Sequence, residues 1–485
     1  LFAVVAVGAA GAGYSAYLAE QRAEAARTTA ERNFDLARQT IDDAIFQFVQ
    51  GFKNSDGVRS AVLQRVLTST RRALDKLANA APEDDKLQRR RVALLAEFGD
   101  LLVKAGDGPG AIAAYEEALA IARTLARRDP DNTQWQRDVS ASLVRVGDMR
   151  AATGDRTAAL AAYEETLAIA RTLARRDPDN TQWQGDVSTS LVRVGDRRAA
   201  TGDRAAALAA YEEALAIRST LARRDPDNTE WQLDVSVSVI KIGDTRDATG
   251  DSAAALAAYE EALAVQRTLV RRDPDNTEWL RYVSFSLDRV GNMRAATGDR
   301  AAALAAYEEA LAIRRTLVRR DPDNIEWQRD VSISLIKVGD MRAATGDRST
   351  ALAAYEEALA IRRTLARRDP DNTDWQRDVS VSLERVGDMR AATGDRAAAL
   401  AAYEESLAVA RTLARRDSSN VQSQTDLVVS LYNLSSVASD AAARRAALSE
   451  ALDIVRRLDG SGQLHVDQRG WIAAIEGELA KLPAP

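Results

Sequence analysis

The amino-acid sequence predicts an all-α solenoid of antiparallel helix pairs, preceded by a single transmembrane helix. Tryptophans recur every 48 residues from Trp135 to Trp375, and residues 295–324 and 343–372 are identical at 27 of 30 positions. A fixed period of this length is typical of repeat architectures, in which each helix pair buries its apolar face against the next pair. The first 19 residues carry no charged side chain.

The N-terminal part is expected to hold three elements. Residues 1–19 are predicted to form the transmembrane helix, because about 20 apolar residues span a bilayer. A signal peptide is the alternative, but it would begin with a basic region and end at a cleavage site, and neither is visible. Residues 20–33 are charged and alanine-rich, as in a helical stalk, and residues 34–81 resemble a divergent helix pair.

The regular array covers residues 82–422. In one copy the first helix is expected at about 277–296 and the second at about 299–320. Pro274 separates successive copies, since proline cannot continue a helix. The next helix is expected to begin on a capping Asn or Thr, and Thr133 has the spacing of a capping box.

The turn between the two helices of a copy carries glycine followed by aspartate, as at Gly298 and Asp299. Glycine tolerates the left-handed position that ends a helix, and aspartate caps the next one. After the regular array, residues 423–485 are expected to form a degenerate repeat and a capping helix, because the 48-residue pattern loosens there.

Between Leu383 and Ser406, the residues Gly387, Gly394, Ala399 and Tyr403 have the spacing of the close-packing positions in tetratricopeptide repeats, and the array resembles that family. The resemblance implies a right-handed superhelix that binds proteins, with the first helices on the concave surface. The repeat here is longer than the family's about 34 residues, so both helices are expected to be extended.

One departure from the family pattern concerns an arginine, Arg390, which stands where the family usually has an aromatic residue. We expect this arginine to pair with a carboxylate of the second helix, Glu404 or Glu405.

Differences between copies fall on one face of the first helix and predict a binding surface for a partner peptide or helix. One position is apolar in the central copies, a second alternates between isoleucine and acidic residues, and a third is aspartate or asparagine. The predicted partner-binding residues are Val237, Ile240, Asp244, Phe285, Asp288, Asn292, Ile333, Ile336, Asp340, Val381, Glu384 and Asp388. For the aspartates the alternative is structural, with each carboxylate pairing to an arginine of a neighbouring helix.

Composition argues against catalysis. The chain has no cysteine and one histidine, His465, which removes Cys/His metal sites and most nucleophilic chemistry. No phosphate-binding loop or catalytic carboxylate motif stands out, so no enzyme activity, metal or cofactor is expected. Acidic and basic residues are interleaved, with a net charge of −6, and nucleic acid is not expected as a partner.

Two functional classes remain open. The first is an interaction scaffold or sensor tethered to a membrane. The alternative is a structural protein that self-assembles through end-to-end or lateral packing of solenoids, as a homo-oligomer.

A second resemblance bears on the first class. The segments Arg32-Asn33-Phe34, Gln50-Gly51-Phe52 and 132–138 look like those of bacterial signalling proteins. In these proteins a toll/interleukin-receptor-like or caspase-like domain precedes one membrane helix and such repeats. The resemblance implies an inner-membrane protein with a further domain upstream of Leu1; it leaves open the side of the membrane on which the repeats lie.

Overall fold

The computed structural model describes residues 83–483 together with Gln21, Glu24, Thr28 and Arg72. The predicted transmembrane helix lies outside these residues, as do nearly all of the predicted stalk and N-terminal helix pair. Within the described part the regular elements are helices, and none of them is both long and apolar enough to cross a membrane. The chain divides into an N-terminal unit, Leu1–Ile217, and a C-terminal unit, Arg218–Pro485.

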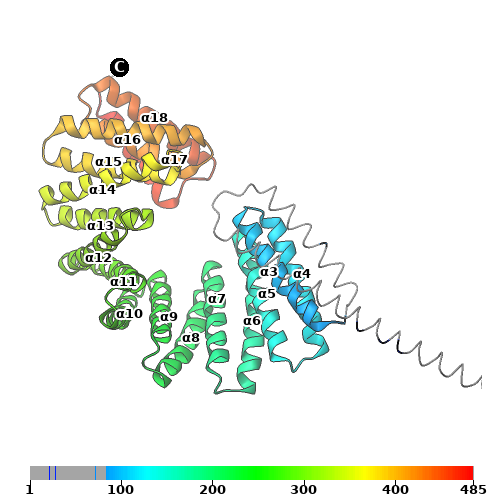
Figure 1. Ribbon diagram of the computed structural model, residues 1–485. Coiled ribbons are helices and arrows are strands. Elements are labelled where there is room, and N and C mark those ends of the chain that lie inside the picture. The colour runs from blue at the N-terminus through cyan, green and yellow to red at the C-terminus, as the bar shows by residue number, and fades with distance from the viewer. Residues whose placement is uncertain (1–20, 22–23, 25–27, 29–71, 73–82, 484–485) are drawn as a thin grey trace, which may run out of the picture. The chain divides into compact units, whose positions relative to one another are not determined.

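In the N-terminal unit, each 48-residue repeat consists of a first and a second helix that pack against each other (Figure 1). The first helices are α3 (Asp85–Lys104), α5 (Thr133–Ala152) and α7 (Thr181–Ala200). The second helices are α4 (Gly108–Arg128) and α6 (Arg156–Arg176), and α8 (Arg204–Arg224) crosses the boundary between the units.

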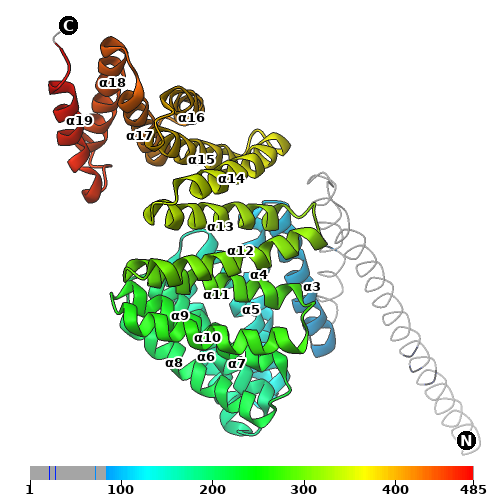
Figure 2. The same ribbon diagram turned by 90° about the vertical axis from the view of Figure 1, so that its left-hand side faces the viewer.

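The C-terminal unit continues the pattern and then departs from it (Figure 2). Its first helices are α9 (Thr229–Ala248), α11 (Thr277–Ala296), α13 (Ile325–Ala344) and α15 (Thr373–Ala392). Its second helices are α10 (Ser252–Arg272), α12 (Arg300–Arg320), α14 (Arg348–Arg368) and α16 (Arg396–Arg416). Four further elements follow: α17 (Val421–Val437), α18 (Ala441–Gly460), a 3-10 helix (Val466–Gln468) and α19 (Gly470–Ala480). The expected helix pair at 277–320 is confirmed.

Short polar motifs fix both ends of each helix. Gly298 has a φ of 86°, and the Asp299 side chain accepts a hydrogen bond from the N–H of Ala302 at the start of α12. The expected glycine–aspartate turn is therefore confirmed. The first helices from α5 to α15 are capped by asparagine instead of threonine, as where Asn276 accepts from the Trp279 N–H at 3.1 Å, and α3 is capped by Asp84. Asparagine occupies the capping position because the threonine beside it already lies inside the first turn.

A glycine and a tyrosine set the distance between the two helices of a repeat. A Cβ added to Gly339 on α13 would lie 2.5 Å from Cε1 of Tyr355 on α14. The tyrosine ring is buried, with 2% of its surface exposed. Around it the second helix presents alanines, such as Ala351 and Ala358, which allow the close approach.

Ion pairs along the surface link successive repeats. Arg363 pairs with Glu405 at 2.5 Å, which connects α14 to α16. Arg390 pairs with Glu356 at 2.5 Å, so its expected pairing with Glu404 or Glu405 is wrong. The reason is that each first helix packs between two second helices, and this arginine points to the preceding one. Exposed pairs of this kind contribute about 0–1 kcal/mol each.

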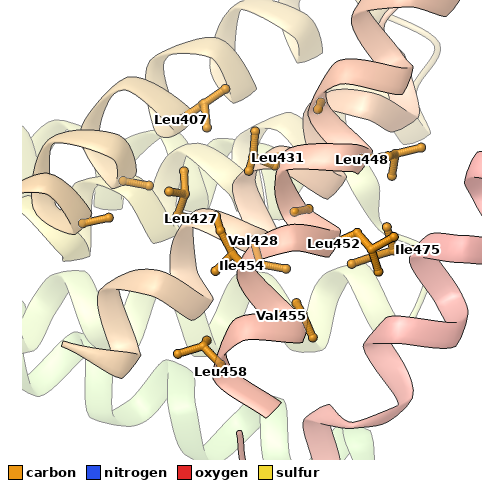
Figure 3. Packing of buried hydrophobic residues seen from close by; sticks show 14 of the residues in the cluster. Leu407, Leu427, Val428, Leu431, Leu448, Leu452, Ile454, Val455, Leu458 and Ile475 are labelled. Carbon is orange, nitrogen blue, oxygen red and sulfur yellow. The ribbon is translucent and has the colours of Figure 1, made fainter. Parts of the chain in front are cut away.

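The end of the array has its own core. Figure 3 shows Leu448 and Val455 of α18 packed with Leu431 of α17 and Ile475 of α19, and all four are almost fully buried. Here leucine replaces the tyrosine of the regular repeats, since Leu448 takes the place on α18 that Tyr403 has on α16.

We predict opposite effects of alanine at two helical glycines. Gly339→Ala should destabilise the protein by about 1–3 kcal/mol, because its Cβ would collide with a rigid buried ring. Gly185→Ala should stabilise it by about 0.5–1 kcal/mol, because that helical position faces open space. Urea unfolding followed by circular dichroism measures both. Equal effects of the two substitutions would contradict the close-contact role of Gly339.

Candidate functional site

The predicted site residues form three columns along the first helices of the C-terminal unit, with one residue of each column per helix. The apolar column is Val237, Phe285, Ile333 and Val381. The inner column is Ile240, Asp288, Ile336 and Glu384. The aspartate column is Asp244, Asn292, Asp340 and Asp388.

The aspartate column lies in a hydrogen-bond relay between repeats. Asp244 accepts from the Tyr259 hydroxyl of its own repeat at 2.8 Å and pairs with Arg289 of the next first helix at 2.8 Å. Similar triplets are Asn292 with Tyr307 and Lys337, and Asp340 with Tyr355 and Arg385. Burial, together with the hydrogen bond to Asp244, raises the pKa of Tyr259. The structural interpretation of this column, with a basic partner on a neighbouring helix, therefore has direct support at Asp244 and Asp340.

The inner column is part of the interior. Ile240 and Ile336 pack against the hydrophobic clusters of adjoining helices. Asp288 is 8% exposed and accepts from Arg314 of α12 at 2.7 Å. Lys337 of α13 lies 3.3 Å from the second oxygen of the same carboxylate. Ile240, Ile336 and Asp288 are therefore much less available to a partner than their helical spacing suggests.

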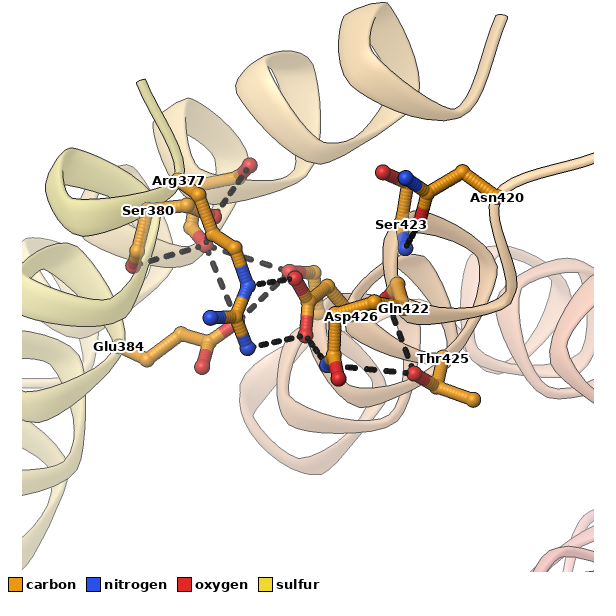
Figure 4. A network of polar contacts seen from close by, with 10 residues as sticks. Arg377, Ser380, Glu384, Asn420, Gln422, Ser423, Thr425 and Asp426 are labelled. Atoms are coloured by element: carbon orange, nitrogen blue, oxygen red, sulfur yellow. Dashed lines mark hydrogen bonds and ion pairs between the residues drawn. The ribbon is translucent and has the colours of Figure 1, made fainter. Parts of the chain in front are cut away.

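Glu384 occupies the inner column on α15 and lies in a polar network (Figure 4). Its carboxylate accepts from Ser430 at 2.7 Å and from Ser406 at 3.3 Å. Burial raises the pKa of Glu384, and the two serine hydroxyls partly oppose that shift. Nearby, Arg377 pairs with Asp426 of α17 at 2.5 Å.

Buried arginines of the second helices form a set that the sequence patterns did not reveal. Arg314 is 2% exposed, and Arg218 and Arg362 are also buried. Arg362 donates to Ser382 at 3.0 Å and to the Asp378 carbonyl at 2.9 Å, which ties α14 to α15. The corresponding residues elsewhere are Ala122, Ala170, Gln266 and Ala410. Comparing this position between copies is the signal that could have identified the set.

The apolar column is partly accessible. Its four members are half-buried, and none belongs to the buried clusters. The equivalent Ala141 and Thr189 in the N-terminal unit are exposed, so this position faces outward. The ring centroid of Phe285 lies 5.8 Å from Cζ of Arg281 and 5.2 Å from Cζ of Arg314.

Changes between copies concentrate on α11. This helix carries Leu280, Tyr282, Phe285, Asp288 and Asn292, where the neighbouring α13 has Gln, Asp, Ile, Ile and Asp. Its surface consequently has more aromatic area and less negative charge than that of α13. Among the described residues, no group of His, Cys, Asp or Glu side chains could hold a metal ion.

A family model described as "Tetratricopeptide repeat" matches residues 286–323, which run from α11 through α12 into the following loop. This segment is therefore similar to a tetratricopeptide repeat. Because the copies are nearly identical, the array as a whole is tetratricopeptide-like. The chain has no match among curated protein sequences.

Solved structures with some likeness include three helical proteins. BtubC from P. vanneervenii is 23% identical, with 52% of this chain and 90% of that chain covered and a TM-score of 0.42. Nearly identical TPR-like repeats from Podosopora anserina are 18% identical, with coverage of 48% and 98% and a TM-score of 0.37. The S. pombe nuclear import adaptor Nro1 is 13% identical, with coverage of 61% and 99% and a TM-score of 0.42. At these scores the likenesses carry no argument about function.

We predict strong coupling between Asp288 and Arg314. Asp288→Ile should destabilise the protein by about 1–3 kcal/mol, because Arg314 loses a buried acceptor and keeps only the contact to Ser334 that Arg362 makes to Ser382 beside Ile336. Adding Arg314→Gln should recover most of that loss, since the pair then matches Ile240 and Gln266 of the preceding repeat. Urea unfolding of the wild type, both single variants and the double variant measures the coupling. Additive losses would show that the two charges do not depend on each other.

Proposed function

We propose that this tetratricopeptide-like array is a protein-interaction scaffold that binds an extended segment or helix of a partner along the first helices α9, α11, α13 and α15. Tetratricopeptide-repeat proteins generally serve as interaction scaffolds. The observation that carries the proposal is the apolar column. It supplies one half-exposed apolar side chain per repeat, at a position where the N-terminal unit has exposed Ala141 and Thr189.

The surroundings of the column favour a specific ligand over a general hydrophobic contact. Asp244 and Asp340 are already engaged within and between repeats, as the relay to tyrosine and arginine shows. Such fixed polar groups border the apolar side chains and would orient a ligand, whereas apolar contact would supply most of its binding energy. The aromatic pair Tyr282 and Phe285 on α11 marks the centre of the proposed surface, since aromatic side chains are enriched where binding energy concentrates.

The test replaces the four residues of the apolar column with threonine, the residue that the chain itself carries at Thr189. We predict that this variant loses partner capture at least tenfold while its helicity remains unchanged. The matched control carries four threonines at exposed alanines of the second helices: Ala257, Ala305, Ala353 and Ala401. Its cost in helix propensity is larger, because alanine is the best helix former whereas Val, Ile and Phe rank near Thr, and it should nevertheless capture normally.

A photo-crosslinking amino acid at position 333, in the full chain in its host cell, identifies the occupant. A second protein attached there supports the proposal, and attachment from position 353 alone contradicts it. Attachment to another copy of the same chain would favour the self-assembling structural protein instead.

We also propose that residues 1–19 anchor the chain in a bacterial inner membrane, with a signalling domain upstream. This proposal is supported by the uncharged N-terminal sequence and by the resemblance of residues 32–52 to such proteins. We predict that the full chain stays with the membrane fraction after carbonate extraction, and that a chain lacking residues 1–19 does not. Release of both would contradict the anchor.

A further inference from the structure

The regular repeats have a shallow groove between the second helix of a repeat and the start of its first helix. In the N-terminal unit the groove between α6 and the start of α5 has a volume of about 340 Å³ and is lined by Gln136, Glu165, Ala168 and Thr172 among others. Arg176 lies across one end, because it donates to the carbonyl oxygens of Pro130 and Asp131 at 3.3 and 3.1 Å. The wall of this regular groove is mainly apolar, and Arg176 covers one of its ends.

The corresponding groove at the end of the array lies between α18 and the start of α17, extends to α16, and has a volume of about 910 Å³. The ion pairs Arg123–Glu165 and Arg411–Glu450 occupy equivalent places, so the residues of the two grooves can be matched to one another from these pairs. In this alignment Asp453 replaces Ala168, Arg457 replaces Thr172, and Ser461 replaces the covering Arg176. The larger volume therefore has a cause in the sequence, since the end of the groove is no longer covered.

The walls of this pocket carry positive charge that the protein does not neutralise. Arg457 donates to the neutral side chain of Gln424 at 2.9 Å and has no carboxylate partner. Arg415, on the opposite wall, is exposed and makes no ion pair or side-chain hydrogen bond with the residues that the structure describes. Its equivalent one repeat earlier, Arg367, donates to the Thr364 hydroxyl at 3.0 Å. Asp453 lies on the same wall as Arg457 and offsets one of the two positive charges.

The floor of the pocket is apolar. Ala414, Leu427 and Ile454 are buried, with 4%, 7% and 7% of their surfaces exposed, and they come from α16, α17 and α18. Guanidinium groups bind carboxylates through paired hydrogen bonds, and an apolar floor between them accepts an aliphatic side chain. A pocket of this size lies within the range of ligand-binding clefts.

We propose that this pocket binds an acidic peptide segment of a partner protein, with a carboxylate between Arg415 and Arg457 and a neighbouring aliphatic side chain against Ala414, Leu427 and Ile454. A peptide fits better than an enclosed small molecule because the pocket is a groove that stays open to solvent between two helices. This second surface is formed by second helices and α17, and is distinct from the apolar column on the first helices.

The test uses calorimetric titration of the full chain with the blocked peptide acetyl-Gly-Glu-Leu-Gly-Glu-Leu-Gly-amide. We expect binding that weakens as salt is added, and at least a tenfold loss with Arg415→Ala combined with Arg457→Thr, the latter restoring the residue of the regular groove. The matched control, Arg367→Ala, removes the equivalent arginine one repeat earlier and should bind normally. Both pocket arginines are exposed, so circular dichroism should show unchanged folding.

Several outcomes would overturn the proposal. These are a lack of binding by the wild-type chain, equal binding of the peptide with glutamine for glutamate, or binding that is insensitive to the two arginine substitutions. Displacement of the peptide by inorganic phosphate at equal concentration would indicate a general anion site instead. Arginine-dependent dimerisation in sedimentation would indicate a second copy as occupant. The apolar-column threonine variant should bind this peptide normally, so the two proposals can fail separately.

Discussion

The close contact between a glycine of the first helix and a tyrosine of the second is the constraint on which each regular repeat depends. The ring of Tyr355 occupies the space that a side chain at position 339 would need, so the two helices meet at a fixed distance. The hydroxyl of that ring then reaches Asp340, the residue after the glycine, which also pairs with Arg385 of the next repeat. One steric contact thereby positions both the helix pair and its connection to the following pair.

Near-identical repeats could pack against one another in many equivalent ways. Some buried residues differ between copies, and these differences distinguish one neighbour from another. Asp288 and Arg314 form a buried ion pair in one repeat, whereas Ile240 and Gln266 occupy the same places in the repeat before. A buried charge brought beside the wrong neighbour would remain unpaired, at a cost of several kcal/mol. The surface ion pairs between repeats contribute little discrimination by comparison, because they are exposed and recur in most copies.

The two proposed binding surfaces arise from opposite features of the array. The apolar column results from variation at one position within an otherwise constant first helix, so it repeats along the solenoid. The pocket beside α18 results from the loss of the repeat pattern at the end of the array. Ser461 stands there in place of the arginine that covers the regular grooves. Variation inside the array and loss of the pattern at its end thus produce surfaces of different chemistry, one mainly apolar and one basic.

The sequence by itself determined the helix pairs, their boundaries and their order, because proline, asparagine and glycine act locally on the backbone at each end. It also assigned Phe285 to the variable face of its helix, since helical spacing assigns a residue to a face. Only the tertiary structure decided that Asp288 is buried, that Glu384 accepts hydrogen bonds from Ser430 and Ser406, and that Arg390 pairs with Glu356 of the preceding repeat. These outcomes depend on which neighbouring helix a side chain meets. Because the repeats are nearly identical, the helix before and the helix after offer similar residues at the same spacing, and the sequence does not distinguish between them.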